Sequence, residues 1–164
     1  MKTLLLMRHA KSDWEADYGA DHDRPLNERG VRNARLMGRV VASQDRVPHL
    51  IISSTAVRAR TTAELAIESG GWDTELRLDP ALYESGPNGV LEVAAGAPDV
   101  DRLMLVGHQP TWSLLVSQTT GDKVDMKTAS IAVIDFQLGT WAEIEGAEGS
   151  LVALLQPGEF AGSI

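Results

Sequence analysis

Residues 2–10 read KTLLLMRHA, and this stretch decides the fold. Its apolar run ends in the pair Arg8-His9, and a second apolar run, LMLVG at residues 103–107, ends directly before His108. Continuous apolar runs of this length are typical of strands buried in a parallel sheet that has helices on both faces. Because such sheets place their chemistry beyond the carboxyl ends of the strands, we expect both histidines at one edge.

Strand-like and helix-like segments alternate along the rest of the chain, which predicts an α/β fold. We expect a three-layer α/β/α sandwich with a mostly parallel central sheet, built as one domain over residues 1–160 with a frayed tail at 161–164. Asn27 is the predicted N-cap of a helix that ends near Ser43. Other helices are expected at residues 56–69, 87–95 and 110–120. Other strands are expected at residues 50–54, 103–106, 130–136, 141–145 and 151–155, of which the last three either form a meander or extend the sheet.

The composition excludes several classes of function. The 164 residues include 23 acidic and 15 basic ones, and the net charge of -8 disfavours binding to nucleic acids. The absence of cysteine excludes disulfides, thiolate metal sites and cysteine nucleophiles. No apolar run approaches the roughly 18 residues of a membrane span, and the N-terminal run does not resemble a signal peptide. We therefore expect a cytoplasmic protein that does not bind membranes, and we expect a monomer.

Three segments carry residue types suited to a phosphoryl group. Arg8 offers a planar fork that matches phosphate oxygens, and a neutral His9 imidazole is a good phosphoryl acceptor. Residues 53–63 (SSTAVRARTTA) are predicted to form a strand end, a turn and the start of a helix. The backbone N–H groups of a helix start favour an anion, and Arg58 in the first turn can point toward the same anion. Gly107 allows a sharp turn after its strand, so His108 is expected to face the same edge.

Four motifs in this order resemble the histidine phosphatase superfamily, also called the phosphoglycerate mutase-like family. They are Arg8-His9-Ala10 with Ser12 and Trp14, then residues 23–30 (DRPLNERG), then Ser54 with Arg58-Ala59 and Thr62-Ala63, and finally Gly107-His108. Within the superfamily the chain is most similar to the small SixA-type phosphohistidine phosphatases. Its length, residues 8–12 (RHAKS) and residues 105–110 (LVGHQP) carry this similarity. The resemblance implies a phosphoglycerate mutase-like fold.

The chain departs from the family pattern at two places. Thr61 stands where the family usually has Gln, and Leu82-Tyr83-Glu84 lacks the Gly-x-Trp-Glu-Gly segment that accompanies a carboxylate general acid in much of the superfamily. Glu84 is therefore either a general acid at the substrate or an ordinary surface residue. The SixA type is thought to work without this acid, because a phosphorylated imidazole leaves more easily than an alkoxide.

The resemblance implies a metal-independent phosphatase without a cofactor, which acts through a phosphohistidine formed on His9. Arg8, Arg58 and His108 are expected to surround the phosphoryl oxygens. Candidates for binding the substrate at the mouth of the site are Ser12, Lys11, Arg24 and Glu84. The expected substrate is a phosphohistidine on a partner protein in signal transduction, and a small phosphate ester is the alternative. A non-catalytic phosphate-binding adaptor is a second alternative.

Other polar and aromatic residues carry two interpretations each. Trp14 and Trp112 lie near the motifs, and each either forms a wall of the pocket or packs in the core or at its rim. The run Asp21-His22-Asp23 either binds a metal or is a solvated loop, which is the interpretation we favour.

Overall fold

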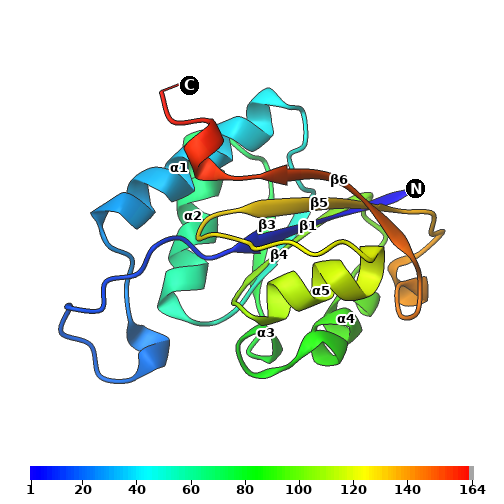
Figure 1. Cartoon of the computed structure of the whole chain (residues 1–164), viewed down its shortest axis with the longest axis horizontal. Helices are drawn as coiled ribbons and strands as arrows, with labels where there is room; N and C mark the ends of the chain where they lie inside the picture. The colour runs from blue at the N-terminus through cyan, green and yellow to red at the C-terminus, as the bar shows by residue number, and fades with distance from the viewer. Residues whose placement is uncertain (163–164) are drawn as a thin grey trace.

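The computed structural model describes residues 1–162, in which a six-stranded sheet lies between two layers of helices (Figure 1). The strands are β1 (Lys2–Arg8), β2 (Leu50–Ser53), β3 (Glu75–Leu78), β4 (Arg102–Gly107), β5 (Ile131–Phe136) and β6 (Gly149–Leu155). Their order across the sheet is β3-β2-β4-β1-β5-β6. The strands from β3 to β1 are parallel, whereas β5 is antiparallel to both β1 and β6. The predicted α/β fold is confirmed, with the last two strands extending the sheet.

Helices pack on both faces of this sheet. On one face lie α1 (Glu28–Ser43) and α2 (Val57–Gly70), and on the other lie α3 (Ala81–Glu84), α4 (Pro87–Ala95) and α5 (Thr111–Thr120). Alternate residues of β1 point to opposite faces, so Leu4 and Leu6 join one core while Leu5 and Met7 join the other. The short 3-10 helices are η1 (Asp21–Asp23), η2 (Trp141–Glu143) and η3 (Pro157–Glu159).

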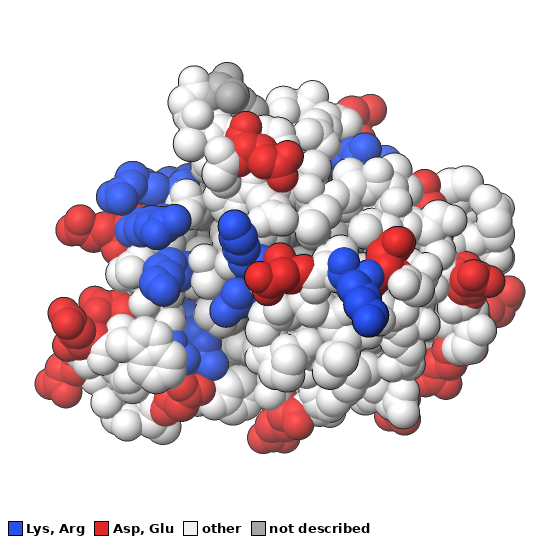
Figure 2. Space-filling model, in the orientation of Figure 1, with Lys and Arg blue, Asp and Glu red and all other residues white. Residues whose placement is uncertain are grey.

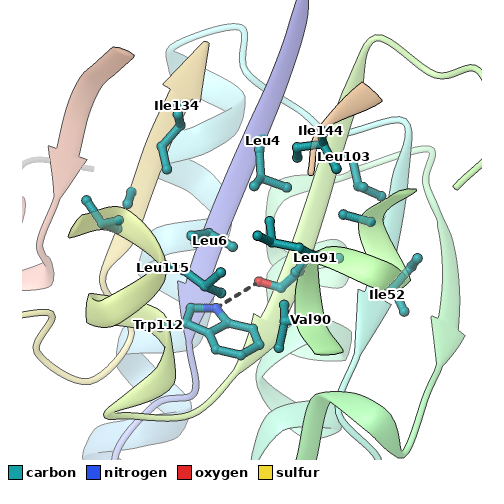
Figure 3. Packing of buried hydrophobic residues seen from close by; sticks show 14 of the residues in the cluster. Leu4, Leu6, Ile52, Val90, Leu91, Leu103, Trp112, Leu115, Ile134 and Ile144 are labelled. Carbon is teal, nitrogen blue, oxygen red and sulfur yellow. Dashed lines mark hydrogen bonds between the residues drawn. The ribbon is translucent and has the colours of Figure 1, made fainter. Parts of the chain in front are cut away.

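The core beneath α4 and α5 contains Trp112 (Figure 3). Its ring is fully buried and its Nε1 donates a hydrogen bond to the carbonyl oxygen of Leu105 at 3.3 Å. A Cβ atom on Gly107 would lie 2.1 Å from this ring, so the end of β4 requires glycine. Of the two interpretations of Trp112, the structure therefore supports the core one.

The start of α1 is fixed against the loop that follows β1. The Asn27 side chain accepts a hydrogen bond from the backbone N–H of Gly30 at 2.8 Å, which confirms the predicted N-cap. A Cβ atom on Gly30 would lie 2.1 Å from the carbonyl oxygen of Lys11, so glycine allows the helix to approach this loop closely. The backbone N–H of Asn27 also donates to the Lys11 carbonyl at 3.0 Å. These contacts hold α1 beside the residues that follow the first strand.

One predicted strand is wrong. Residues 141–143 form η2 rather than a strand, and a hydrogen bond from the backbone N–H of Thr140 to Glu143 Oε1 at 3.3 Å caps this turn. Trp141 is buried there, and its Nε1 donates to the carbonyl oxygen of Val100 at 2.7 Å. The helix α3 was not predicted, and the predicted tail at 161–164 lies partly outside the described residues.

Among residues 1–162, no helix has the length and apolarity needed to cross a bilayer.

Candidate active site

The two histidines lie side by side beyond the ends of neighbouring parallel strands. Arg8 of β1 is paired with Gly107 of β4, so His9 and His108 follow at the same level. The backbone N–H of His9 donates to the Gly107 carbonyl at 3.0 Å, and the two imidazole centroids are 5.2 Å apart. The predicted meeting of the two histidines at one sheet edge is confirmed.

The environment of His9 keeps its imidazole neutral and oriented. The ring is only 8% exposed, and Nδ1 lies 2.7 Å from the carbonyl oxygen of Ala10, so Nδ1 carries the hydrogen and Nε2 keeps its lone pair. Burial lowers the pKa of His9 to about 3, against the hydrogen bond to Ala10, and the positive charges of His108, Arg58 and Arg8 lower it further. At neutral pH, His9 therefore presents a free nucleophilic nitrogen.

His108 is oriented by a serine from the end of β2. Its Nε2 lies 2.8 Å from Ser54 Oγ, which itself accepts a hydrogen bond from the backbone N–H of Ala56 at 3.1 Å. The serine O–H is therefore free to donate to Nε2, which leaves the hydrogen of His108 on Nδ1. This Nδ1 is buried and has no hydrogen-bond partner within the described residues. Burial lowers the pKa of His108 to about 4, and the positive charge of Arg58 also lowers it. The imidazole is therefore neutral, and its Nδ1–H can donate to an anion.

Three arginine side chains lie beside the histidines, of which Arg24 and Arg58 are buried and Arg8 is half-buried. Arg8 donates to the Met126 carbonyl at 2.9 Å, whereas Arg24 donates to Ser12 Oγ and, at 3.0 Å, to Asp21. The Nε atoms of Arg8, Arg24 and Arg58 are buried without a hydrogen-bond partner among residues 1–162. Unpartnered buried donors are costly, and because all three arginines line one cavity, their guanidinium groups are suited to a multiply charged oxyanion.

A single carboxylate, Asp21 in η1, organises two of these guanidinium groups. Arg58 donates to the Asp21 carbonyl oxygen at 2.8 Å and to its Oδ2 at 3.0 Å, and Arg24 donates to its Oδ1 at 3.0 Å. The Tyr83 hydroxyl donates to Oδ2 at 2.9 Å. Burial alone would raise the pKa of Asp21, but the hydrogen bonds from Tyr83, Arg24 and Arg58 outweigh it and lower the pKa to about 2. Asp21 therefore stays charged and holds both arginines in place.

A cavity of about 220 Å³ opens at this edge of the sheet. Its lining residues are Arg8, His9, Lys11, Ser12, Trp14, Arg24, Arg58, His108, Gln109 and Thr128. Figure 2 shows that lysine and arginine side chains gather on the side of the molecule toward which β1 runs, whereas the opposite end carries mostly aspartate and glutamate. The site is thus a locally basic pocket on an acidic protein.

The cavity brings together every predicted site residue except Glu84. Glu84 is exposed at the end of α3 and is not among the lining residues, so its position supports the surface interpretation. Trp14 forms part of the wall, with the Arg24 guanidinium 3.5 Å from its ring centroid.

Several residues of the site were not predicted from sequence. They are Asp21, Ser54, Tyr83, Gln109 and Thr128. Tyr83, rather than the adjacent Glu84, faces the site, since its ring lies 5.4 Å from that of His108. Asp21 lies in the Asp21-His22-Asp23 run, for which we favour the interpretation as a solvated loop. The sequence signal that could have identified it as a site residue is its position three residues before Arg24, with which it forms an ion pair. Within residues 1–162, no group of three or more His, Asp or Glu side chains is arranged to hold a metal ion.

Comparison with known proteins decides the family. The family model of the histidine phosphatase superfamily (branch 1) matches residues 4–92. The chain belongs to this superfamily. An uncharacterized relative from Mycobacterium tuberculosis is 36% identical to this chain over 163 residues, which cover 92% of this chain and 99% of the relative.

Solved structures place this chain among the SixA-type members of the superfamily. A protein from Nakamurella multipartitia, described as a phosphohistidine phosphatase SixA, matches with a TM-score of 0.83 and 29% identity over 95% of this chain and 96% of its own. A protein from Agrobacterium tumefaciens with the same description matches with a TM-score of 0.82 and 28% identity over 95% of this chain and 98% of its own. The family and these neighbours support a phosphatase activity.

Proposed function

We propose that this protein hydrolyses phosphohistidine on a partner protein through a covalent phosphohistidine intermediate on His9. The observation that carries the proposal is the lining of the cavity. It combines a neutral imidazole with a free Nε2, three guanidinium groups and a second imidazole, and no lining residue is a carboxylate. The SixA descriptions of the neighbours support the same substrate class.

In the first step, His9 Nε2 attacks phosphorus while the phosphorus–nitrogen bond of the substrate breaks. Arg8, Arg58 and the Nδ1–H of His108 surround the transferred group and stabilise the charge on its oxygens. Because the Ala10 carbonyl keeps the hydrogen of His9 on Nδ1, the nucleophile needs no base to remove a proton. The phosphorylated His9 then carries both the phosphoryl group on Nε2 and a hydrogen on Nδ1.

This reaction balances without a general acid. A phosphohistidine substrate that is protonated on its second ring nitrogen leaves as a neutral imidazole, so no proton has to be delivered to the breaking bond. An alkyl phosphate, in contrast, leaves as an alkoxide and requires a proton donor, and the lining of the cavity provides no carboxylic acid. The composition of the site therefore favours phosphohistidine over an alkyl ester.

In the second step, water attacks the phosphoryl group on His9. The phosphorus–Nε2 bond breaks, the ring returns to its neutral form with Nδ1 still protonated, and dihydrogen phosphate is released. The positive charge that a metal ion supplies in other phosphatases is provided here by Arg8, Arg24 and Arg58. We therefore propose that both steps proceed without a metal.

The proposal is tested by comparing phosphate release from a phosphohistidine-containing protein and from an alkyl phosphate, glycerol 2-phosphate, both in the presence of EDTA. We expect release from phosphohistidine with EDTA present and much slower turnover of the ester. Turnover of esters alone would indicate a small-molecule phosphatase instead. Binding of phosphate without turnover of either compound would indicate the adaptor function.

A further inference from the structure

A second groove adjoins the catalytic cavity. It has a volume of about 420 Å³ and is lined by Arg29, Asn33, Lys127, Thr128, Gln156, Pro157, Gly158 and Glu159. Thr128 lines both the groove and the catalytic cavity. A chain segment attached to a phosphoryl group in the cavity can therefore pass Thr128 and enter the groove.

The walls of this groove are fixed relative to the catalytic residues. Arg29 and Asn33 come from α1, whose first turn packs directly on the Lys11 backbone through Gly30. Lys127 and Thr128 come from the segment before β5, where the Arg8 guanidinium donates to the Met126 carbonyl at 2.9 Å. The other lining residues, 156–159, follow β6 and include η3. The groove and the phosphoryl site therefore form one preorganised surface.

The groove carries unpaired positive charge. Arg29 and Lys127 are exposed, and among residues 1–162 neither has a carboxylate oxygen within 4.0 Å. The one carboxylate in the lining, Glu159, accepts a hydrogen bond from the backbone N–H of Gln156 at 3.3 Å and so caps its own turn. Lys11 adds a further exposed cation in the neighbouring cavity.

On this basis we infer that the groove binds an acidic segment that flanks the phosphohistidine on the partner protein, an inference that rests on the proposed function. Arg29 and Lys127 would pair with aspartate or glutamate side chains of this segment, while the Asn33 and Gln156 side-chain amides can bond its backbone. Because the whole protein has a net charge of -8, its field repels an acidic segment, and the positive charge of the groove attracts such a segment only locally. The partner is thus recognised at its modified histidine and at the residues next to it.

The test uses two peptides that carry phosphoryl-triazolylalanine, a non-hydrolysable analogue of phosphohistidine. One peptide has Asp and Glu around the analogue, and the other has Lys and Arg. Fluorescence anisotropy gives the ratio of their dissociation constants for the wild type, the double variant Arg29→Glu/Lys127→Glu and the control Arg35→Glu. Arg35 is an exposed arginine of the same helix that does not line the groove.

We expect the wild type to prefer the acidic peptide by about tenfold or more at low ionic strength, with the preference falling as salt rises. The double variant should lose or reverse this preference, and Arg35→Glu should keep it. Equal binding of both peptides by the wild type, or an equal loss in Arg35→Glu, would overturn the inference. Turnover of phosphoimidazole, measured separately, tests the proposed function, so a preference without turnover would retain the groove and reject that function.

Discussion

Acidification should destabilise this protein through its two active-site histidines. Burial lowers the pKa of His9 to about 3 and that of His108 to about 4, whereas both titrate near 6.5 in the unfolded chain. Because both folded pKa values are depressed, the unfolded chain gains protons that the folded chain does not bind. Their contribution to stability is therefore fully present above about pH 6.5 and is lost as the pH falls toward the folded pKa values.

The size of this effect follows from the two pKa values. A pH of about 5 is above both folded pKa values and about 1.5 units below the unfolded pKa of each histidine. At about 1.36 kcal/mol per unit, this costs roughly 2 kcal/mol for each histidine and about 4 kcal/mol for the pair. A loss of this size is a large share of the roughly 5–15 kcal/mol that stabilises a typical domain.

The assay is urea unfolding at about pH 8 and at about pH 5, with tryptophan fluorescence as the signal that reports unfolding. It compares the wild type with His9→Asn, His108→Asn and the double variant, all of which retain His22 and His49. We expect the loss of unfolding free energy on acidification to be about 2 kcal/mol smaller in each single variant and about 4 kcal/mol smaller in the double variant. If the wild type and the double variant lose the same free energy, the reasoning from buried neutral histidines is refuted.

Three further predictions concern residues around the site and in the core. Asp21→Asn removes the charge that holds Arg24 and Arg58, so the KM for phosphoimidazole should rise roughly tenfold, and an unchanged KM would argue against this role. Glu84→Gln should leave steady-state hydrolysis of phosphohistidine within about twofold of wild type, because Glu84 lies outside the cavity, whereas a large fall in kcat would identify a general acid. Trp112→Ala should lower the unfolding free energy by about 3–5 kcal/mol in urea titrations, and a cost below about 1 kcal/mol would contradict its place in the core.

The meeting of His9 and His108 could be predicted because it depends on strong sequence signals. Two apolar runs specify buried parallel strands, and their parallel pairing places the residues that follow them at one edge. The start of α1 was equally predictable, since Asn27 is followed by a helical pattern and its side chain caps the first turn.

The contacts of Asp21 and Tyr83 could not be predicted, because they depend on tertiary packing. Asp21 lies in a short 3-10 helix without apolar periodicity, and its partner Arg58 is 37 positions away. The helix α3 has four residues, and burial of Leu82 decides that Tyr83 rather than Glu84 faces the site. Short elements of this kind carry too few residues to reveal their orientation in the sequence.

The measurement that tests the central claim most directly is rapid-quench intact mass analysis of the protein after mixing with a phosphohistidine-containing substrate. The account predicts that the wild type transiently gains the mass of one phosphoryl group, that the adduct is labile to acid and stable to base, and that peptide mapping places it on His9. His9→Ala should show neither the adduct nor phosphate release. Turnover by the wild type without any adduct, or undiminished phosphate release by His9→Ala, would contradict the account.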